Sequence, residues 1–160
     1  MLSVLDLFRI GIGPSSSHTV GPIRIGKRFV DRLIRREVFG AADRIEVRLR
    51  GSLAFTGEGH ATPKASILGL LGLEPETLDP DAADSLVAKV YTNHILLLGG
   101  TRNITFNPET DLLFDYDTPA DLHPNEMYLA AYGSGGELLS EQTYYSTGGG
   151  FIASHEQLAT

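Results

Sequence analysis

A dense run of hydroxyl and imidazole side chains follows two glycines near the beginning of the sequence. Serine and threonine are favoured N-cap residues, and an amphipathic pattern starts directly after the run, so we expect a loop that leads into a helix. The free N–H groups and partial positive charge at such an end suit a carboxylate or a phosphate. An ordinary helix cap is the alternative, but several hydroxyls beside a histidine favour a small-anion site. The segment reads Gly11-Ile12-Gly13-Pro14-Ser15-Ser16-Ser17-His18-Thr19.

Two of the five histidines lie on glycine-containing loops ahead of predicted helices. His18 belongs to the serine run, and His60 belongs to the segment Gly57-Glu58-Gly59-His60-Ala61-Thr62-Pro63. Histidine is the side chain best suited to proton transfer near neutral pH, so the two loops could converge on one ligand. A lone histidine is more often structural. His123 lies in a turn, Leu122-His123-Pro124-Asn125, while His94 and His155 are expected to face solvent.

Two further glycine-rich segments differ from phosphate-binding motifs. Gly133-Ser134-Gly135-Gly136 lies between two predicted strands, which favours a hairpin turn. Gly148-Gly149-Gly150 follows a strand, and three consecutive glycines are costly to order. They indicate close approach of the backbone to a ligand or a partner domain, with a flexible exit from the sheet as an equal alternative.

Length and composition are typical of one globular domain. The chain has 160 residues, 42% hydrophobic and 21% charged, and no apolar run approaches the roughly 20 residues that span a bilayer. We expect a cytoplasmic protein without membrane association, since no basic region precedes the apolar residues at the start. The sequence contains no cysteine, which excludes disulfides and thiolate ligands within this chain. Because no histidines and carboxylates have compact ligand spacing either, we expect no metal held by this chain alone.

Charge is unevenly distributed along the chain. Residues 1–50 contain ten Lys or Arg and five Asp or Glu, a net charge of +5, so the remaining residues carry −12 of the total of −7. The basic residues alternate with apolar ones at helical spacing, which is typical of the solvated face of an amphipathic helix. Without interleaved aromatics they do not indicate nucleic-acid binding, although they could meet an acidic partner domain. The charged residues of this helix are Arg24, Lys27, Arg28, Asp31, Arg32, Arg35 and Arg36.

The order of predicted elements favours an α+β fold with helices packed on a mostly antiparallel sheet. Helices are expected from Ser17 or Thr19 to Val38, from Thr62 or Pro63 to Leu71, and from Asp79-Pro80 to about Asn93. An alternating pattern predicts a half-buried strand over 44–51. Further strands are expected at 95–98, 104–106, 112–114, 127–132 and 137–146.

Several of these motifs together resemble the N-terminal (beta) domain of bacterial iron–sulfur L-serine dehydratase. The resemblance extends over residues 1–160, in order and at sensible spacing. It implies an α+β domain similar to the allosteric substrate-binding domain of phosphoglycerate dehydrogenase. The segments that carry it are Asp6-Leu7-Phe8, the run from Ile10 to Pro22, Gly51-Ser52-Leu53, Thr56-Gly57, Gly59-His60, and Tyr144-Tyr145-Ser146-Thr147-Gly148-Gly149-Gly150-Phe151.

The resemblance also implies a chemistry and a partner. Enzymes of this family deaminate L-serine to pyruvate and ammonia without pyridoxal phosphate, using a [4Fe-4S] cluster held by cysteines of a larger alpha domain, whose iron acts as a Lewis acid. The cysteine-free chain is therefore expected to be the beta domain only, as a fragment or a separate subunit, and to be inactive alone. A homodimer is one option for its assembly. Similarity assigns Ser15, Ser16, Ser17, His18 and Thr19 to the substrate carboxylate. It makes His60 the expected base, and His123 a weaker substrate-binding candidate.

Two other classes of function remain open at this stage. The chain could be a non-catalytic module that binds serine or a hydroxy acid as an effector, because fold alone does not separate binding from catalysis. It could also be a pyridoxal-phosphate enzyme with the serine run as a phosphate cup. That reading requires a Schiff-base lysine. Only Lys27, Lys64 and Lys89 are present, the first and last on predicted helix surfaces.

Overall fold

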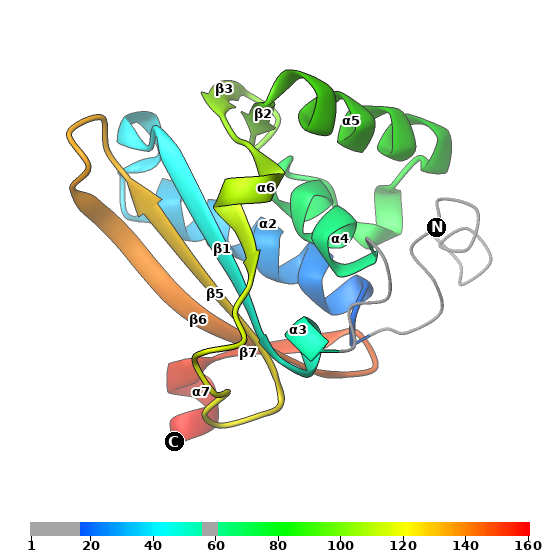
Figure 1. Ribbon diagram of the computed structural model, residues 1–160, viewed down its shortest axis with the longest axis vertical. Coiled ribbons are helices and arrows are strands. Elements are labelled where there is room, and N and C mark those ends of the chain that lie inside the picture. The colour runs from blue at the N-terminus through cyan, green and yellow to red at the C-terminus, as the bar shows by residue number, and fades with distance from the viewer. Residues whose placement is uncertain (1–16, 56–60) are drawn as a thin grey trace.

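A five-stranded sheet forms the centre of the computed structural model, which describes residues 17–55 and 61–160 (Figure 1). Across the sheet the strands are β4 (Leu112–Phe114), β1 (Arg44–Gly51), β5 (Asn125–Tyr132), β6 (Leu138–Gly148) and β7 (Phe151–Ser154). The pairing of β1 with β4 is parallel, and the other three pairings are antiparallel. The predicted α+β fold with a mostly antiparallel sheet is therefore confirmed.

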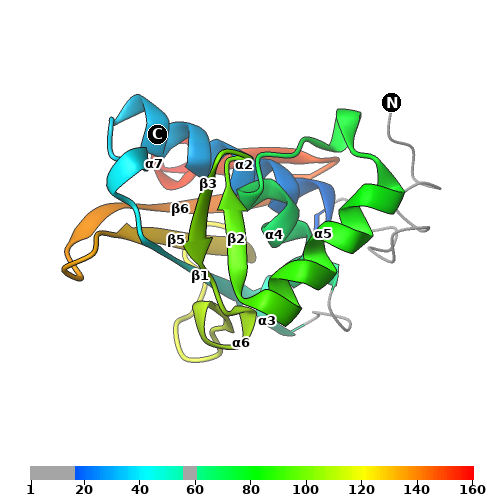
Figure 2. The same ribbon diagram turned by 90° about the horizontal axis from the view of Figure 1, so that it is seen from above.

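Two helices cover one face of this sheet and contact each other. They are α2 (Val20–Arg35), which contacts β5, β6 and β7, and α4 (Ala61–Leu70). Next to α4 lie α5 (Pro80–Asn93) and the small hairpin of β2 (Ile95–Leu98) and β3 (Arg102–Thr105), as Figure 2 shows from above. The remaining short elements are η1 (Phe39–Ala41), α3 (Ser52–Phe55), η2 (Pro75–Thr77), α6 (Pro108–Asp111) and α7 (His155–Ala159).

The amphipathic pattern of α2 accounts for its packing. Its apolar face is fully buried, including Ile23, Phe29 and Leu33, while its basic residues remain partly or fully exposed. The helix ends at Arg35, three residues before the predicted end. Glu37 adopts φ 60°, and the N–H groups of Glu37 and Val38 donate to the carbonyls of Ile34 and Leu33. This arrangement is a Schellman motif, in which glycine is the usual residue, so the sequence carries no signal for it.

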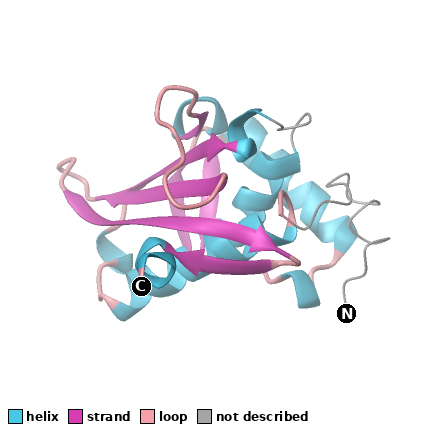
Figure 3. Ribbon diagram, turned by 90° about the horizontal axis from the view of Figure 1, so that it is seen from below, coloured by secondary structure: helices cyan, strands magenta, loops and turns pink. Residues whose placement is uncertain are grey.

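The other predicted elements mostly agree with the structure, and the disagreements have local causes. The strand expected at 104–106 is β3, which begins two residues earlier and ends one residue earlier because Arg102–Thr105 pairs with Ile95–Leu98. The short helices α3, α6 and α7 and the strand β7 were not predicted. The turn at Gly133–Gly136 joins β5 to β6 as expected, with the Gly133 N–H donating to the Glu137 carbonyl. Figure 3 shows this connection projecting at one end of the layer of strands.

Two glycines set the distance between α2 and α4. A Cβ atom built on Gly69 would lie 2.2 Å from the Ile23 carbonyl oxygen and 2.9 Å from the Gly26 Cα. A Cβ on Gly26 would lie 2.9 Å from the Leu70 nitrogen. The two backbones therefore touch where neither residue has a side chain. This contact aligns the two helices that begin just after the His18 and His60 segments.

Candidate functional site

The end of the serine run meets the carboxyl end of β1. Ser17, His18 and Thr19 lie within the described residues, whereas Ser15 and Ser16 lie outside them. The His18 Nδ1 is 2.8 Å from the Ser17 hydroxyl, and its Nε2 is 3.3 Å from the Ser52 carbonyl oxygen. A carbonyl oxygen only accepts, so Nε2 carries the hydrogen and, in the neutral ring, Nδ1 accepts from Ser17. Thr19 is buried at the N-cap position of α2, and its side chain makes no capping hydrogen bond to the helix.

The start of α4 is tied to the same segment. The buried Thr62 donates from its hydroxyl to the His18 carbonyl oxygen over 3.0 Å. The predicted base, His60, lies outside the described residues, but α4 begins at the very next residue, Ala61. The structure therefore brings the His18 backbone together with α4, the helix that follows His60.

The Ser52 peptide links this site to the turn before β5. Its N–H donates to the Pro124 carbonyl over 2.8 Å, while its own carbonyl faces His18. Gly51 precedes it with φ 58°, and a Cβ there would lie 2.1 Å from the Pro124 oxygen. The partners of Ser52 and Thr62 are distant in the sequence, so local sequence patterns did not predict that these two residues belong to the site.

His123 occupies a different environment. Its Nδ1 accepts from the Asn125 N–H over 3.0 Å, and its ring meets the Tyr145 ring edge-on at 6.4 Å between centroids. Tyr144 faces the side of the sheet covered by α2, so by alternation along β6 Tyr145 faces the opposite side. The turn that carries His123 nevertheless adjoins the His18 contacts, because the carbonyl of the next residue, Pro124, accepts from the Ser52 N–H. His155 is partly buried with Nε2 2.9 Å from Asp121 Oδ2, whereas His94 is exposed as expected.

The three glycines form a tight connection at the edge of the sheet. Gly148, Gly149 and Gly150 have φ values of 106°, 64° and 83°, and the chain returns directly into β7. The chain therefore continues into the next strand of the same sheet and does not exit from the sheet here. A Cβ on Gly150 would lie 2.9 Å from the Arg24 guanidinium and 3.1 Å from Val20 Cγ1, so this backbone closely approaches the first turns of α2. The Arg24 guanidinium donates to the Gly150 carbonyl.

A buried polar network lies on the face of the sheet opposite α2. Arg50 contacts Asp115 Oδ2 at 3.1 Å and Glu126 Oε2 at 3.2 Å, and the Tyr145 hydroxyl donates to Glu126 over 2.8 Å. Burial, followed by the hydrogen bond to Glu126, raises the pKa of Tyr145 to about 12. Burial by itself would raise the pKa of Asp115, but hydrogen bonds from Arg50 and Thr118 hold that pKa below the ordinary value. With every charge paired, this network supports the sheet and offers no group poised for catalysis.

The described residues do not fit an iron–sulfur cluster. Over 17–55 and 61–160 no three His, Cys, Asp or Glu side chains are grouped so as to hold a metal ion, and the sequence has no cysteine to supply thiolates. Within the same residues no helix is long and apolar enough to cross a membrane.

Comparison with known proteins agrees with the sequence motifs. Residues 3–157 match the family model described as serine dehydratase beta chain. L-serine dehydratase 1 of Escherichia coli is 43% identical over 98% of this chain, and the L-serine dehydratase of Haemophilus influenzae is 44% identical over 95%. The enzyme of Streptomyces coelicolor is 43% identical over 97%. The chain spans about a third of the length of these relatives. It belongs to the serine dehydratase beta-chain family.

Proposed function

We propose that this chain is the substrate-binding part of an iron–sulfur-dependent L-serine ammonia-lyase, which converts L-serine to pyruvate and ammonia. In this proposal residues 1–160 form the beta domain, and a cluster-bearing alpha domain or subunit completes the enzyme. The hydrogen bond from Thr62 to the His18 carbonyl carries the proposal. It holds the helix that follows His60 against the end of the serine run, as a shared substrate site requires.

The geometry around His18 supports a division of roles between the two histidines. Both ring nitrogens of His18 already have partners, Ser17 and the Ser52 carbonyl. With both nitrogens occupied, this imidazole is suited to holding the serine run in place for a carboxylate rather than to removing a proton. We assign proton removal from the substrate α-carbon to His60, which a histidine can perform near neutral pH.

The carboxylate of the substrate is assigned to the serine run. Ser15, Ser16 and Thr19 supply hydroxyl donors, and Ser17 supplies another when its hydroxyl turns from His18 to the ligand. The start of α2 supplies N–H groups with a partial positive charge. Binding the carboxylate at the start of α2 would place the substrate near the start of α4, which Thr62 ties to His18. His123 contacts Tyr145 on the other side of the sheet, so it stays a weaker substrate-binding prediction.

The cluster would be held entirely outside this chain, because the chain has no cysteine. When bound in the complete enzyme, the cluster supplies a Lewis acid for the departing hydroxyl. The Gly148–Gly150 connection lies beside the first turns of α2. Because these three glycines have no side chains, we propose that the partner domain or the ligand comes close to the backbone of this chain there.

A chimeric enzyme tests the proposal directly. The matched third of the E. coli L-serine dehydratase 1 would be replaced by this chain, and pyruvate formation from L-serine would be measured under anaerobic conditions. We expect the chimera to form pyruvate and to lose that activity when His60 is changed to alanine. The chain alone, after anaerobic reconstitution with iron and sulfide, should show no cluster absorbance and no turnover.

Two outcomes would contradict the proposal. A folded chimera with normal cluster absorbance but no turnover would favour the non-catalytic effector-binding alternative, especially if this chain alone binds serine. Pyruvate formation by the isolated chain would show that it is not merely one part of the enzyme. Cluster absorbance serves as the control for correct assembly in every variant.

A further inference from the structure

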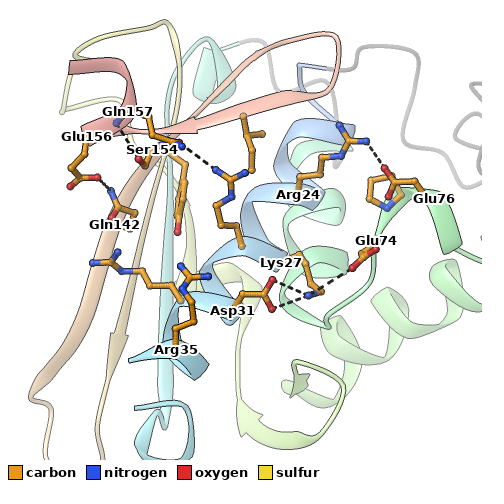
Figure 4. A pocket seen from close by; sticks show the side chains of 15 residues that line it. Arg24, Lys27, Asp31, Arg35, Glu74, Glu76, Gln142, Ser154, Glu156 and Gln157 are labelled. Carbon is orange, nitrogen blue, oxygen red and sulfur yellow. Dashed lines mark hydrogen bonds and ion pairs between the residues drawn. The ribbon is translucent and has the colours of Figure 1, made fainter. Parts of the chain in front are cut away.

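A basic groove lies between α2 and the β6–β7 edge of the sheet, with the η2 segment at one end. Its volume is about 590 Å³, within the range of small-molecule sites. Figure 4 shows that Arg24, Lys27 and Arg35 extend from α2, while Gln142, Glu156 and Gln157 come from the opposite wall. The groove is separate from the contacts of His18 with Ser52 and Thr62.

The cations along this groove fall into two groups. Arg24 is paired with Glu76, and Lys27 contacts Asp31 at 2.8 Å and Glu74 at 3.9 Å. Arg28, Arg32 and Arg35 also line the groove, but in the part of the chain that the structure describes no carboxylate lies within 4.0 Å of their guanidinium groups. None of the three forms an ion pair there, although Arg32 interacts electrostatically with Glu156 on the opposite wall.

The three arginines share one face of α2. Their spacing of i, i+4 and i+7 places like charges next to each other, which destabilises a helix in the absence of a counter-charge. Their partners in the groove are neutral: Arg32 Nε donates to the Ser140 hydroxyl over 3.0 Å, and Arg28 lies 3.4 Å from Gln157 Oε1. Each guanidinium has five N–H donors, so most of them remain available for a ligand.

The opposite wall adds a buried hydroxyl. Tyr144 lines the groove and is 2% exposed. Burial raises the pKa of Tyr144, and the charges of Arg32, Arg28 and Arg35, which line the same groove, act against that rise. The side-chain amide of Gln142 donates to Glu156 over 2.9 Å. Three arginines without an ion pair thus line one concavity together with neutral polar groups and four carboxylates.

We propose that this groove binds a small dianion, such as a phosphate monoester or a dicarboxylate, as an effector separate from the serine site. Arginine forks match the oxygens of phosphate and carboxylate groups through paired hydrogen bonds. Two negative charges would offset most of the +3 charge of Arg28, Arg32 and Arg35.

The rim of the groove favours a small ligand over an acidic protein surface. Asp31, Glu74, Glu76 and Glu156 all line the groove, so an extended acidic segment would lie against these carboxylates as well as the arginines. Like charges placed against each other disfavour such a partner. A compact dianion can enter between the carboxylates and contact the arginines directly.

Isothermal titration calorimetry on the unmodified 160-residue chain tests the inference. Sodium phosphate, malonate and acetate would be titrated separately at constant ionic strength, because surface charge effects are screened by salt. We expect saturable binding of phosphate or malonate and at least about tenfold weaker binding of acetate, which can satisfy only one arginine fork. In the 15N spectrum, the side-chain amides of Gln142 and Gln157 should shift on phosphate or malonate addition.

Matched variants locate the site. The double variant Arg28→Gln/Arg32→Gln should weaken phosphate or malonate binding at least about tenfold, because two charge-assisted contacts are lost. Arg36→Gln is the control, since it removes the same kind of charge from the exposed end of α2 outside the groove. Equal weakening by Arg36→Gln would overturn the proposal, as would equal binding of acetate, or binding of polyglutamate with neither small dianion. Failure of the serine-lyase proposal would leave these titrations unchanged.

Discussion

Replacing Gly69 by alanine should force α2 and α4 apart. The new Cβ would lie 2.2 Å from the Ile23 carbonyl oxygen, whereas heavy atoms in ordinary contact are separated by about 3.5 Å. The obstacle is backbone on a buried helix, so no side-chain rotation relieves it. The helices must separate by about 1 Å, and a gap of that size forfeits about a quarter to a half of each dispersion contact between them.

The expected magnitude follows from two opposing effects. Overpacking of a well-packed core costs about 3 kcal/mol at the upper end of its usual range. Alanine in place of glycine within a helix returns about 1 kcal/mol. The net loss is about 2 kcal/mol of unfolding free energy, which corresponds to a fall of about 4–8 °C in the melting temperature for a chain of this size.

Urea denaturation and thermal melting of the two proteins measure this loss. Gly40→Ala is the matched control, because nothing lies within 4 Å of its added Cβ, and we expect it to change stability by less than about 0.5 kcal/mol. A Gly69→Ala protein as stable as the unmodified chain would refute the reasoning that backbone contact at this position sets the spacing of the helices.

Two other perturbations address charge and chemistry. The pKa of Asp115 is lower in the folded state than its unfolded value of about 3.8. Its contribution to stability is therefore present above pH 3.8 and is lost as the pH falls through the folded-state pKa. Urea midpoints measured from pH 6 to pH 2.5 should fall less steeply below pH 4 in Asp115→Asn than in the unmodified chain. In the chimeric enzyme, His60→Ala should lower kcat at least about a hundredfold with little change in KM, whereas His18→Ala should mainly raise KM. Steady-state kinetics, with cluster content measured for each variant, tests these two roles. The reverse pattern would make His18 the base and His60 the substrate-binding residue.

The elements with strong local signals were predicted well. β1 alternates apolar and charged residues over 44–51 and forms over that range. The start of α5 follows from Asp79, whose side chain accepts from the Asp81 N–H ahead of a proline at the first helical position. Periodicity and capping are properties of neighbouring residues, which is why they can be read without the fold.

The unpredicted elements depend on contacts that a local pattern does not contain. β7 forms because the three glycines turn the chain back against β6. One missed element did carry a signal: Ser154 and Gln157 form a capping box that starts α7. At the site, the motif identified the segment but not its partners, because the contact of His18 with Ser52 spans 34 residues.

The position of β1 in the sheet has a consequence for the order of folding. Val47 at its centre pairs with Leu112 on one side and with Leu129 on the other, so both neighbours come from much later in the chain. During synthesis β1 stays without either partner until those strands have emerged, while α2 and α4 can already pair. Strands that are far apart in the sequence pair slowly, because the entropy cost of closing the loop comes before the strand contacts can stabilise it. We therefore expect the carboxyl end of β1 to become ordered late, so that His18 gains its contact with Ser52 only near the end of folding.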